Sequence, residues 1–204
     1  DGVQHGNSRV EAVCAGGQNF DAGAVGSADY LDSPGVTWTP TRFTVSYWLK
    51  PRSMYNYNQG FGAGQGWGYF ACHTVNGGAL YVGTDVGTRF TPANTAGAYT
   101  INQWSYITFT FDSGNAGIYK SGILMSAMGG MVNPAGPWAG FLLNNSLDGV
   151  VDEVRLSSVA RSADWVWAEY QNMAANDSFC AYGAVQTDAA ADAAVEVGLG
   201  EGRH

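Results

Sequence analysis

The chain has 204 residues, of which 46% are hydrophobic and 13% are charged, and its formal net charge is −8. Binding to a phosphate backbone or to an anionic membrane surface requires a basic protein surface, so we expect no nucleic-acid partner. No apolar run approaches the length of a membrane-spanning helix, and we expect no membrane insertion. The aromatic content of 13% favours a β domain, because rings fit a pleated, half-buried surface.

Strand patterns follow one another along most of the chain. Residues 1–35 predict loops around short strands. The clearest strand covers residues 42–51, where apolar side chains alternate with others and Pro51 ends the run. Residues 66–85 predict a hairpin around an Asn-Gly-Gly turn. The alternating apolar positions of the clearest strand are Phe43, Val45, Tyr47 and Leu49.

Four more strands are predicted downstream. Residues 103–127 predict a hairpin, and residues 136–158 predict two strands joined by an Asn-Asn turn. Trp48 lies on the polar face of the clearest strand, and we expect a loop to cover it. The core face of the hairpin is formed by Ile107, Phe109 and Phe111.

A helical pattern occurs once, in residues 162–173. Ser162 is a good N-cap residue, and Asp164 falls in the first turn, where a negative charge is favourable. The residues expected to face the sheet are Trp165, Ala168 and Tyr170. Because all other patterns have strand-and-turn spacing, the sequence predicts an all-β sandwich with one short C-terminal helix.

Asp152 is the most informative residue of the sequence for the chemistry of the protein. Strict alternation places it on the same strand face as Val150, Val154 and Leu156. The opposite face would carry Val151, Glu153 and Arg155. A carboxylate on a buried face is costly unless it is hydrogen-bonded, paired or bound to a metal. The sequence therefore predicts a specific partner for Asp152.

The cysteines leave two alternatives open. Cys14, Cys72 and Cys180 have no CxxC spacing, so zinc is not indicated. The first alternative is three buried thiols. The second is a disulfide between Cys14 and Cys180, since the first and last strands of a sandwich often lie side by side. The low lysine content and the Gly/Asn/Thr-rich loops favour secretion.

The C-terminal segment differs from the rest. Residues 1–185 are predicted to form the sandwich, and residues 186–204 form an alanine-rich tail. One interpretation is a flexible linker. The other is a strand over residues 193–199, because Val195, Val197 and Leu199 alternate with smaller or polar residues.

Four segments resemble a known family: RFTVSYWLKP, QWSYITFTFD, GIYKSGILM and LDGVVDEVRLSSVARSADWVWAEYQN. Across roughly residues 18 to 183 the chain resembles the laminin G-like jelly-roll modules of the concanavalin A-like lectin/glucanase superfamily, in particular bacterial extracellular versions. The resemblance implies two antiparallel sheets packed face to face. Members bind glycans or proteins, or serve as accessory modules of larger secreted chains, so we expect a secreted or cell-surface protein.

The resemblance also implies a structural calcium ion. In many members the aspartate at the position of Asp152 binds Ca²⁺ near the beginning of the chain. Ca²⁺ takes six to eight oxygen ligands, many from the backbone. Carbonyls around Gly17, together with Asp21 or Asp1, would complete the shell. The alternative is that Asp152 accepts backbone N–H groups from a neighbouring loop.

Family modules usually begin with an additional strand, and this chain starts inside the loop that would follow it. A missing strand would leave a sheet edge unpaired, and such edges invite strand addition. The predicted strand containing Val195, Val197 and Leu199 would fill the gap, in its own domain or in a neighbouring copy. Addition to a neighbouring copy would produce a self-associating subunit of a filament, surface layer or virion.

Glucanases of the superfamily carry carboxylates at alternate positions of one strand, which retaining hydrolysis needs about 5–5.5 Å apart. No two of the five glutamates are spaced in this way, and Asp152 and Glu153 point to opposite faces. His5, His73 and His204 are scattered, and no Gly-x-Ser-x-Gly elbow occurs. We therefore expect a non-enzyme.

The ligand-binding candidates lie in the glycine-rich segment of residues 53–70. Its aromatic residues are Tyr55, Tyr57, Phe61 and Trp67. Exposed apolar rings usually mark a contact, which here is either a glycan or protein ligand or the rest of the sandwich. The main hypothesis is a non-catalytic extracellular recognition or adhesion module stabilised by calcium. The alternative hypothesis is the structural subunit that assembles through its tail.

Overall fold

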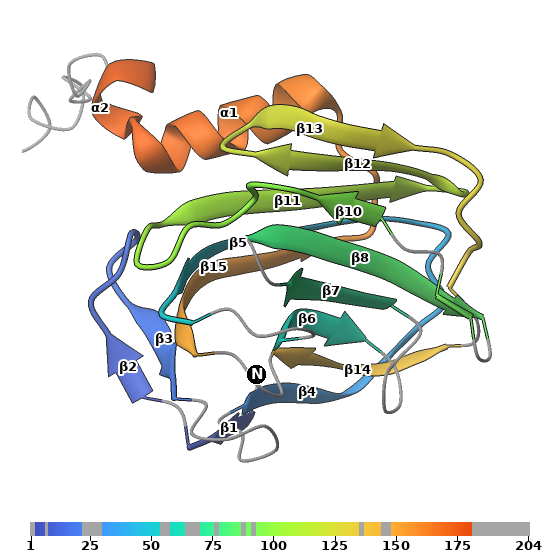
Figure 1. The fold of residues 1–204 in the computed structure, drawn as a ribbon, viewed down its shortest axis with the longest axis horizontal. Helices are drawn as coiled ribbons and strands as arrows, with labels where there is room; N and C mark the ends of the chain where they lie inside the picture. The colour runs from blue at the N-terminus through green and yellow to red at the C-terminus, as the bar shows by residue number, and fades with distance from the viewer. Residues whose placement is uncertain are drawn as a thin grey trace, which may run out of the picture.

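The computed structural model describes residues 3–6, 8–21, 30–53, 58–63, 70–75, 78–86, 89–90, 93–134, 137–143 and 148–180. In this part of the chain, antiparallel strands form two sheets that pack face to face, and helix α1 (Ala163–Ala174) runs beside β12 and β13 (Figure 1). A four-residue helix, α2 (Asn176–Phe179), follows α1. The predicted jelly-roll sandwich with a short C-terminal helix is confirmed.

Each sheet combines pairings between consecutive strands with pairings between strands far apart in the sequence. The first sheet has the order β1 (Val3–His5), β4 (Tyr30–Trp38), β14 (Trp138–Leu143), β6 (Asn58–Ala63), β7 (Phe70–Val75), β8 (Ala79–Val86) and β10 (Ala93–Thr95), with β9 (Arg89–Phe90) paired to β8. The second sheet has the order β13 (Ile123–Met128), β12 (Asn115–Lys120), β11 (Ser105–Asp112), β5 (Arg42–Pro51), β15 (Gly149–Ser157), β3 (Gly17–Phe20) and β2 (Ser8–Val10).

The predicted hairpins are present as β7–β8 and β11–β12. The two strands predicted within residues 136–158 also form, but they do not pair with each other. Strand β14 joins the first sheet and β15 the second. The two strands therefore lie in different layers of the sandwich.

The core lies between the sheets. Strand β5 pairs with β11 in a register that places Phe43 opposite Phe111 and Val45 opposite Phe109. The rings of Phe43 and Phe111 stack with centroids 5.2 Å apart. From the first sheet, Leu80 of β8 joins the same buried cluster. The predicted inward-facing residues of β5 and β11 are thus confirmed, and the alternate residues of β5 face outward from the sandwich.

The strict alternation predicted for β15 is wrong. Asp152 pairs with Trp48 of β5, but Arg155 pairs with Ser46, so β15 carries one extra residue at this point. Glu153 lies in this β-bulge with a φ of 49°. Asp152 and Arg155 therefore share the outer face of the sheet with Trp48 and Ser46. The inner face receives Val151, Val154 and Leu156, which pack in or against the core.

Helix α1 begins as predicted, because the Oγ atom of Ser162 accepts a hydrogen bond from the backbone N–H of Trp165 at 3.3 Å. The side chains buried on α1 are Val166 and Glu169. Tyr170 packs on Trp48 with ring centroids 5.8 Å apart. Trp48 is thus buried as predicted, but the helix contributes to its cover in addition to any loop.

The predicted Cys14–Cys180 disulfide is wrong, because both cysteines are free thiols in the structure. Cys14 precedes β3, near one edge of the second sheet. Cys180 follows α2, and its Sγ atom lies 3.2 Å from the side-chain oxygen of Asn172. The chain approaches Cys180 along α1, which contacts β13 at the other edge of that sheet. Helix α2, which Cys180 follows, therefore lies apart from β3, which Cys14 precedes (Figure 1).

The tail with Val195, Val197 and Leu199 lies outside the described residues, so the strand over 193–199 and assembly through it stay predictions. Neither helix in the described part of the chain is long and apolar enough to cross a membrane.

Candidate functional site

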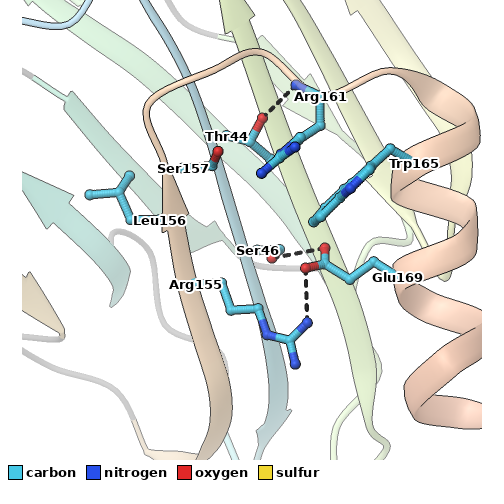
Figure 2. Close-up of a pocket in the computed structure, with 8 residues that line it drawn as sticks. All are labelled: Thr44, Ser46, Arg155, Leu156, Ser157, Arg161, Trp165 and Glu169. Atoms are coloured by element: carbon cyan, nitrogen blue, oxygen red, sulfur yellow. Dashed lines mark hydrogen bonds and ion pairs between the residues drawn. The ribbon is translucent and has the colours of Figure 1, made fainter.

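A pocket of about 320 Å³ opens on the outer face of the second sheet, between β5, β15 and α1 (Figure 2). Its lining combines charged groups, hydroxyl groups and one indole ring. The residues are Thr44 and Ser46 from β5, Arg155, Leu156 and Ser157 from β15, and Arg161, Trp165 and Glu169 from α1 and the turn before it. Leu156 borders the pocket from β15, but its side chain points away from it and packs against the core (Figure 2). This mixture of an aromatic wall and convergent polar groups is typical of a small-ligand site.

Thr44 holds the turn that precedes α1 against the sheet. Its hydroxyl donates to the carbonyl oxygen of Val159 at 2.8 Å and accepts from the backbone N–H of Arg161 at 2.9 Å. Because the side chain is short and buried, the turn before α1 can approach β5 closely. The outer-face hydroxyls of β5 thereby position the residues that form the far wall of the pocket.

Glu169 is a buried carboxylate whose oxygens are occupied. Arg155 donates to Oε1 at 2.9 Å, and Tyr106 donates to Oε2 at 2.6 Å. Ser46 donates to the same Oε2 at 3.3 Å. These contacts compensate the cost of burying the charge. Burial and the hydrogen bond to Glu169 raise the pKa of Tyr106 far above its usual range, which keeps this phenol protonated as a donor.

Arg155 links the pocket to the bulge. Besides Glu169, it binds the carboxylate of Glu153 through Nη2 at 2.6 Å. Burial lowers the pKa of Arg155, but the hydrogen bonds to Glu169 and Glu153 more than offset this and raise it overall. The charge of Arg155 is therefore committed to two acidic side chains of the protein itself.

Arg161 is placed differently. Its guanidinium carbon lies 4.3 Å from the centroid of the Trp165 ring, which is a cation–π contact. Its Nε atom is buried and has no hydrogen-bond partner, and no carboxylate pairs with Arg161 in the described part of the chain. Trp165 is 37% exposed. Figure 2 shows both side chains projecting toward the same space.

Asp152 has the partners that the second alternative required. Its Oδ2 atom accepts the backbone N–H of Cys14 at 2.7 Å, and its Oδ1 atom accepts the N–H of Glu153 at 2.8 Å. It thereby ties the turn before β3 to the bulge of β15. Burial, followed by the charges of Glu153 and Asp152, raises the pKa of the Cys14 thiol.

The calcium ligands predicted from the resemblance do not come together in full. Gly17 starts β3 beside β15, where an added Cβ atom would lie 2.6 Å from the carbonyl oxygen of Val151. Asp21 follows Phe20, whose partner on β15 is Gly149. This register separates Asp21 from Asp152 by about 13 Å, at roughly 3.3 Å per residue.

Asp21 instead forms an ion pair with Arg52. The same guanidinium contacts Asp148 at 2.7 Å, the side chain of Asn19 at 2.6 Å and the carbonyl oxygen of Phe20 at 2.7 Å. Among the described residues, no group of three or more His, Cys, Asp or Glu side chains could hold a metal ion. Calcium binding through Asp152 and backbone carbonyls near Gly17 therefore stays a prediction.

The predicted ligand-binding rings are not tested. Tyr55, Tyr57 and Trp67 lie outside the described residues. Phe61 lies in β6, where its backbone pairs with Cys72 of β7, and its side chain lies outside the described part of the structure. The sequence interpretation missed Arg161, Trp165 and Glu169 as parts of one site. A usable signal was the carboxylate of Glu169, three residues after Val166 on the buried face of the predicted helix.

Comparisons with known proteins agree with this architecture. A family model described as the concanavalin A-like lectin/glucanases superfamily matches residues 25–167. No curated protein matches the chain. Domain 4 of AbnA, an extracellular arabinanase from Geobacillus stearothermophilus solved with arabinotriose, has a TM-score of 0.64 and 16% identity, covering 81% of this chain and 86% of that chain.

Two toxin domains are also similar. The binding domain of Paraclostridial Mosquitocidal Protein 1 has a TM-score of 0.66 and 13% identity, covering 84% of this chain and 47% of that chain. The ligand binding domain of botulinum neurotoxin serotype D, in complex with N-acetylneuraminic acid, has a TM-score of 0.57 and 14% identity, covering 71% and 40%. The chain thus spans less than half the length of either toxin domain.

At these identities the three structures share the fold with this chain, and their ligands remain their own. The family model covers well over half of the sequence, and the described strands form the two packed sheets that it implies. The chain belongs to the concanavalin A-like lectin/glucanases superfamily.

Proposed function

We propose that the chain is a non-catalytic recognition module that binds a saccharide in the pocket between β5, β15 and α1. The observation that carries this proposal is the partly exposed ring of Trp165 beside the unpaired guanidinium of Arg161. The apolar face of a sugar ring packs on an indole, while its hydroxyl groups accept and donate hydrogen bonds at the rim. Two of the similar structures, the arabinanase domain and the serotype D toxin domain, contain saccharides, which supports this class of ligand.

The chemistry of the pocket favours binding over hydrolysis. Glycoside hydrolysis uses two carboxyl groups, one of which donates a proton to the leaving group. Glu169 is the carboxylate that lines the pocket, and both of its oxygens accept hydrogen bonds from the protein. Glu153 sits in the bulge and pairs with Arg155. Neither group is placed to exchange a proton with a bound sugar.

We propose an extracellular setting, either secreted or at a cell surface, with the module attached to or accompanying a longer chain. The acidic composition and the superfamily support this setting. A structural calcium ion bound by Asp152 remains part of the proposal. It would tie together the turn before β3 and the bulge of β15, which the hydrogen bonds of Asp152 already join.

The test is a glycan array followed by calorimetry with the best ligand. Trp165→Ala should weaken binding by a factor of about 2 to 10, because an aromatic contact contributes about 0.5–1.5 kcal/mol and 1.4 kcal/mol is a factor of ten. Trp167→Ala is the matched control, since Trp167 is 47% exposed on the same helix and packs on Phe179 instead. Equal losses in both variants, or no binding to any glycan, would contradict the proposal.

A further inference from the structure

We propose, on the basis of the function above, that the pocket recognises a carboxylate group and that its saccharide ligand is acidic. Arg161 would receive the carboxylate while Trp165 packs against the sugar ring.

The other arginines with described ion pairs are neutralised by the protein. Arg42 pairs with Asp112, and Arg52 pairs with Asp21 and Asp148. Arg155, on the opposite side of the same pocket, pairs with Glu153 and Glu169. Arg161 has no such partner in the described part of the chain, and its Nε–H is buried without an acceptor. A negatively charged ligand group would supply the partner that this pocket cation lacks.

The orientation of Arg161 leaves the correct edge free. The indole of Trp165 covers one face of the guanidinium group. The backbone N–H of Arg161 is already bound to Thr44. The Nε–H is buried, so the N–H groups of the two terminal nitrogens remain for the ligand, and two parallel N–H groups match the two oxygens of a carboxylate. A neutral sugar would not offer two charged oxygens to these parallel N–H groups.

The uncompensated charge of Arg161 favours a ligand with a single negative charge. Two arginines line the pocket, and Glu169 and Glu153 already neutralise Arg155, so Arg161 offers the positive charge that remains for a ligand. Glu169 does not compete for Arg161, because Arg155, Tyr106 and Ser46 occupy its oxygens. A carboxylate carries one charge and matches this excess. A phosphate group carries about 1.5 to 2 charges at neutral pH and would be less well compensated.

The experiment compares acids with neutral partners of the same shape. The probes are sialyllactose and trigalacturonic acid, each compared with its own methyl ester by calorimetry at low and high salt. At least one acid should bind at least tenfold more tightly than its neutral partner, and salt should reduce this difference. Arg161→Gln should abolish the difference, Arg161→Lys should restore part of it, and Arg42→Gln should leave it unchanged.

The possible failures are distinguishable. Neutral and acidic probes that bind equally would overturn the carboxylate inference and leave saccharide binding standing. If no probe of either pair binds, the inference is overturned, and the glycan array then decides on saccharide binding separately. Inorganic sulfate that competes as well as the acids would show a general anion site and would also overturn the inference. The ester comparison needs no variant, so it stands even if Arg161→Gln does not fold.

Discussion

Replacement of Glu169 by glutamine should destabilise the fold more than any other isosteric change near the pocket. The side chain of Glu169 is 4% exposed and ion-paired with Arg155. Glutamine keeps the size and one acceptor oxygen but loses the charge. Its NH₂ group must then face either Arg155 or the hydroxyls of Tyr106 and Ser46, all of which donate in the native structure.

The expected loss of stability follows from how deeply the partners of the two carboxylate oxygens are buried. Removal of one partner from a buried ion pair costs about 3–5 kcal/mol. Arg155 is 41% exposed and keeps Glu153, so solvent screens part of this loss. Tyr106 is fully buried, and a buried hydroxyl without an acceptor costs about 1–3 kcal/mol. Together these terms predict a loss of about 2–3 kcal/mol for Glu169→Gln.

Glu153→Gln provides the matched control. Glu153 binds the same arginine at 2.6 Å, but its side chain is 29% exposed. An ion pair of this kind contributes about 0–1 kcal/mol. Urea denaturation at pH 7, followed by circular dichroism, measures both variants and shows whether their m-values match the wild type. If Glu169→Gln lies within about 0.5 kcal/mol of Glu153→Gln, the reasoning about the buried carboxylate is refuted.

Two further predictions concern calcium and pH. Calcium binding through Asp152 predicts that CaCl₂ raises the Tm of the wild type and leaves that of Asp152→Asn unchanged; an unchanged wild-type Tm in millimolar calcium contradicts it. The raised pKa of Tyr106 predicts alkaline destabilisation. The unfolded chain releases the phenol proton near the ordinary pKa of 10.0, while the folded protein keeps it, so stability is complete below that pH and falls as the pH rises above it. Urea denaturation at pH 9, 10 and 11 should show this fall in the wild type and a smaller one in Tyr106→Phe; parallel curves would contradict the assignment.

Local patterns in the sequence were sufficient for β5, for the two predicted hairpins and for the start of α1. The alternation in β5 identified Phe43 and Val45 as core residues, and Ser162 marked the start of α1, because each depends on neighbouring residues alone. The disulfide between Cys14 and Cys180 failed for the opposite reason. The disulfide prediction depended on which sheet edges the two ends of the chain approach. The spacing of residues along a single strand does not determine the order of strands in a sheet.

The pocket was also beyond the reach of local patterns. It joins β5, β15 and α1, so its members approach one another only after the helix has packed on the sheet. Asp152 shows what the sequence could and could not decide. Its need for a partner followed from the cost of a buried carboxylate, and both alternatives were open. The backbone N–H of Cys14 reaches Asp152 only because the fold packs the turn before β3 against β15, and the N–H of Glu153 supplies the second hydrogen bond.

The bulge at Glu153 explains how one strand serves both the core and the pocket. Without the extra residue, alternation would turn Arg155 toward the core and Leu156 toward the pocket. A guanidinium between the sheets would lack both water and Glu169, which the structure could not tolerate. The bulge reverses these positions, so that Leu156 packs against the core and Arg155 neutralises Glu169. Because Glu169 is thereby satisfied within the protein, Arg161 remains available to a ligand. The pairing of charges in the pocket thus depends on the one extra residue that shifts the register of β15.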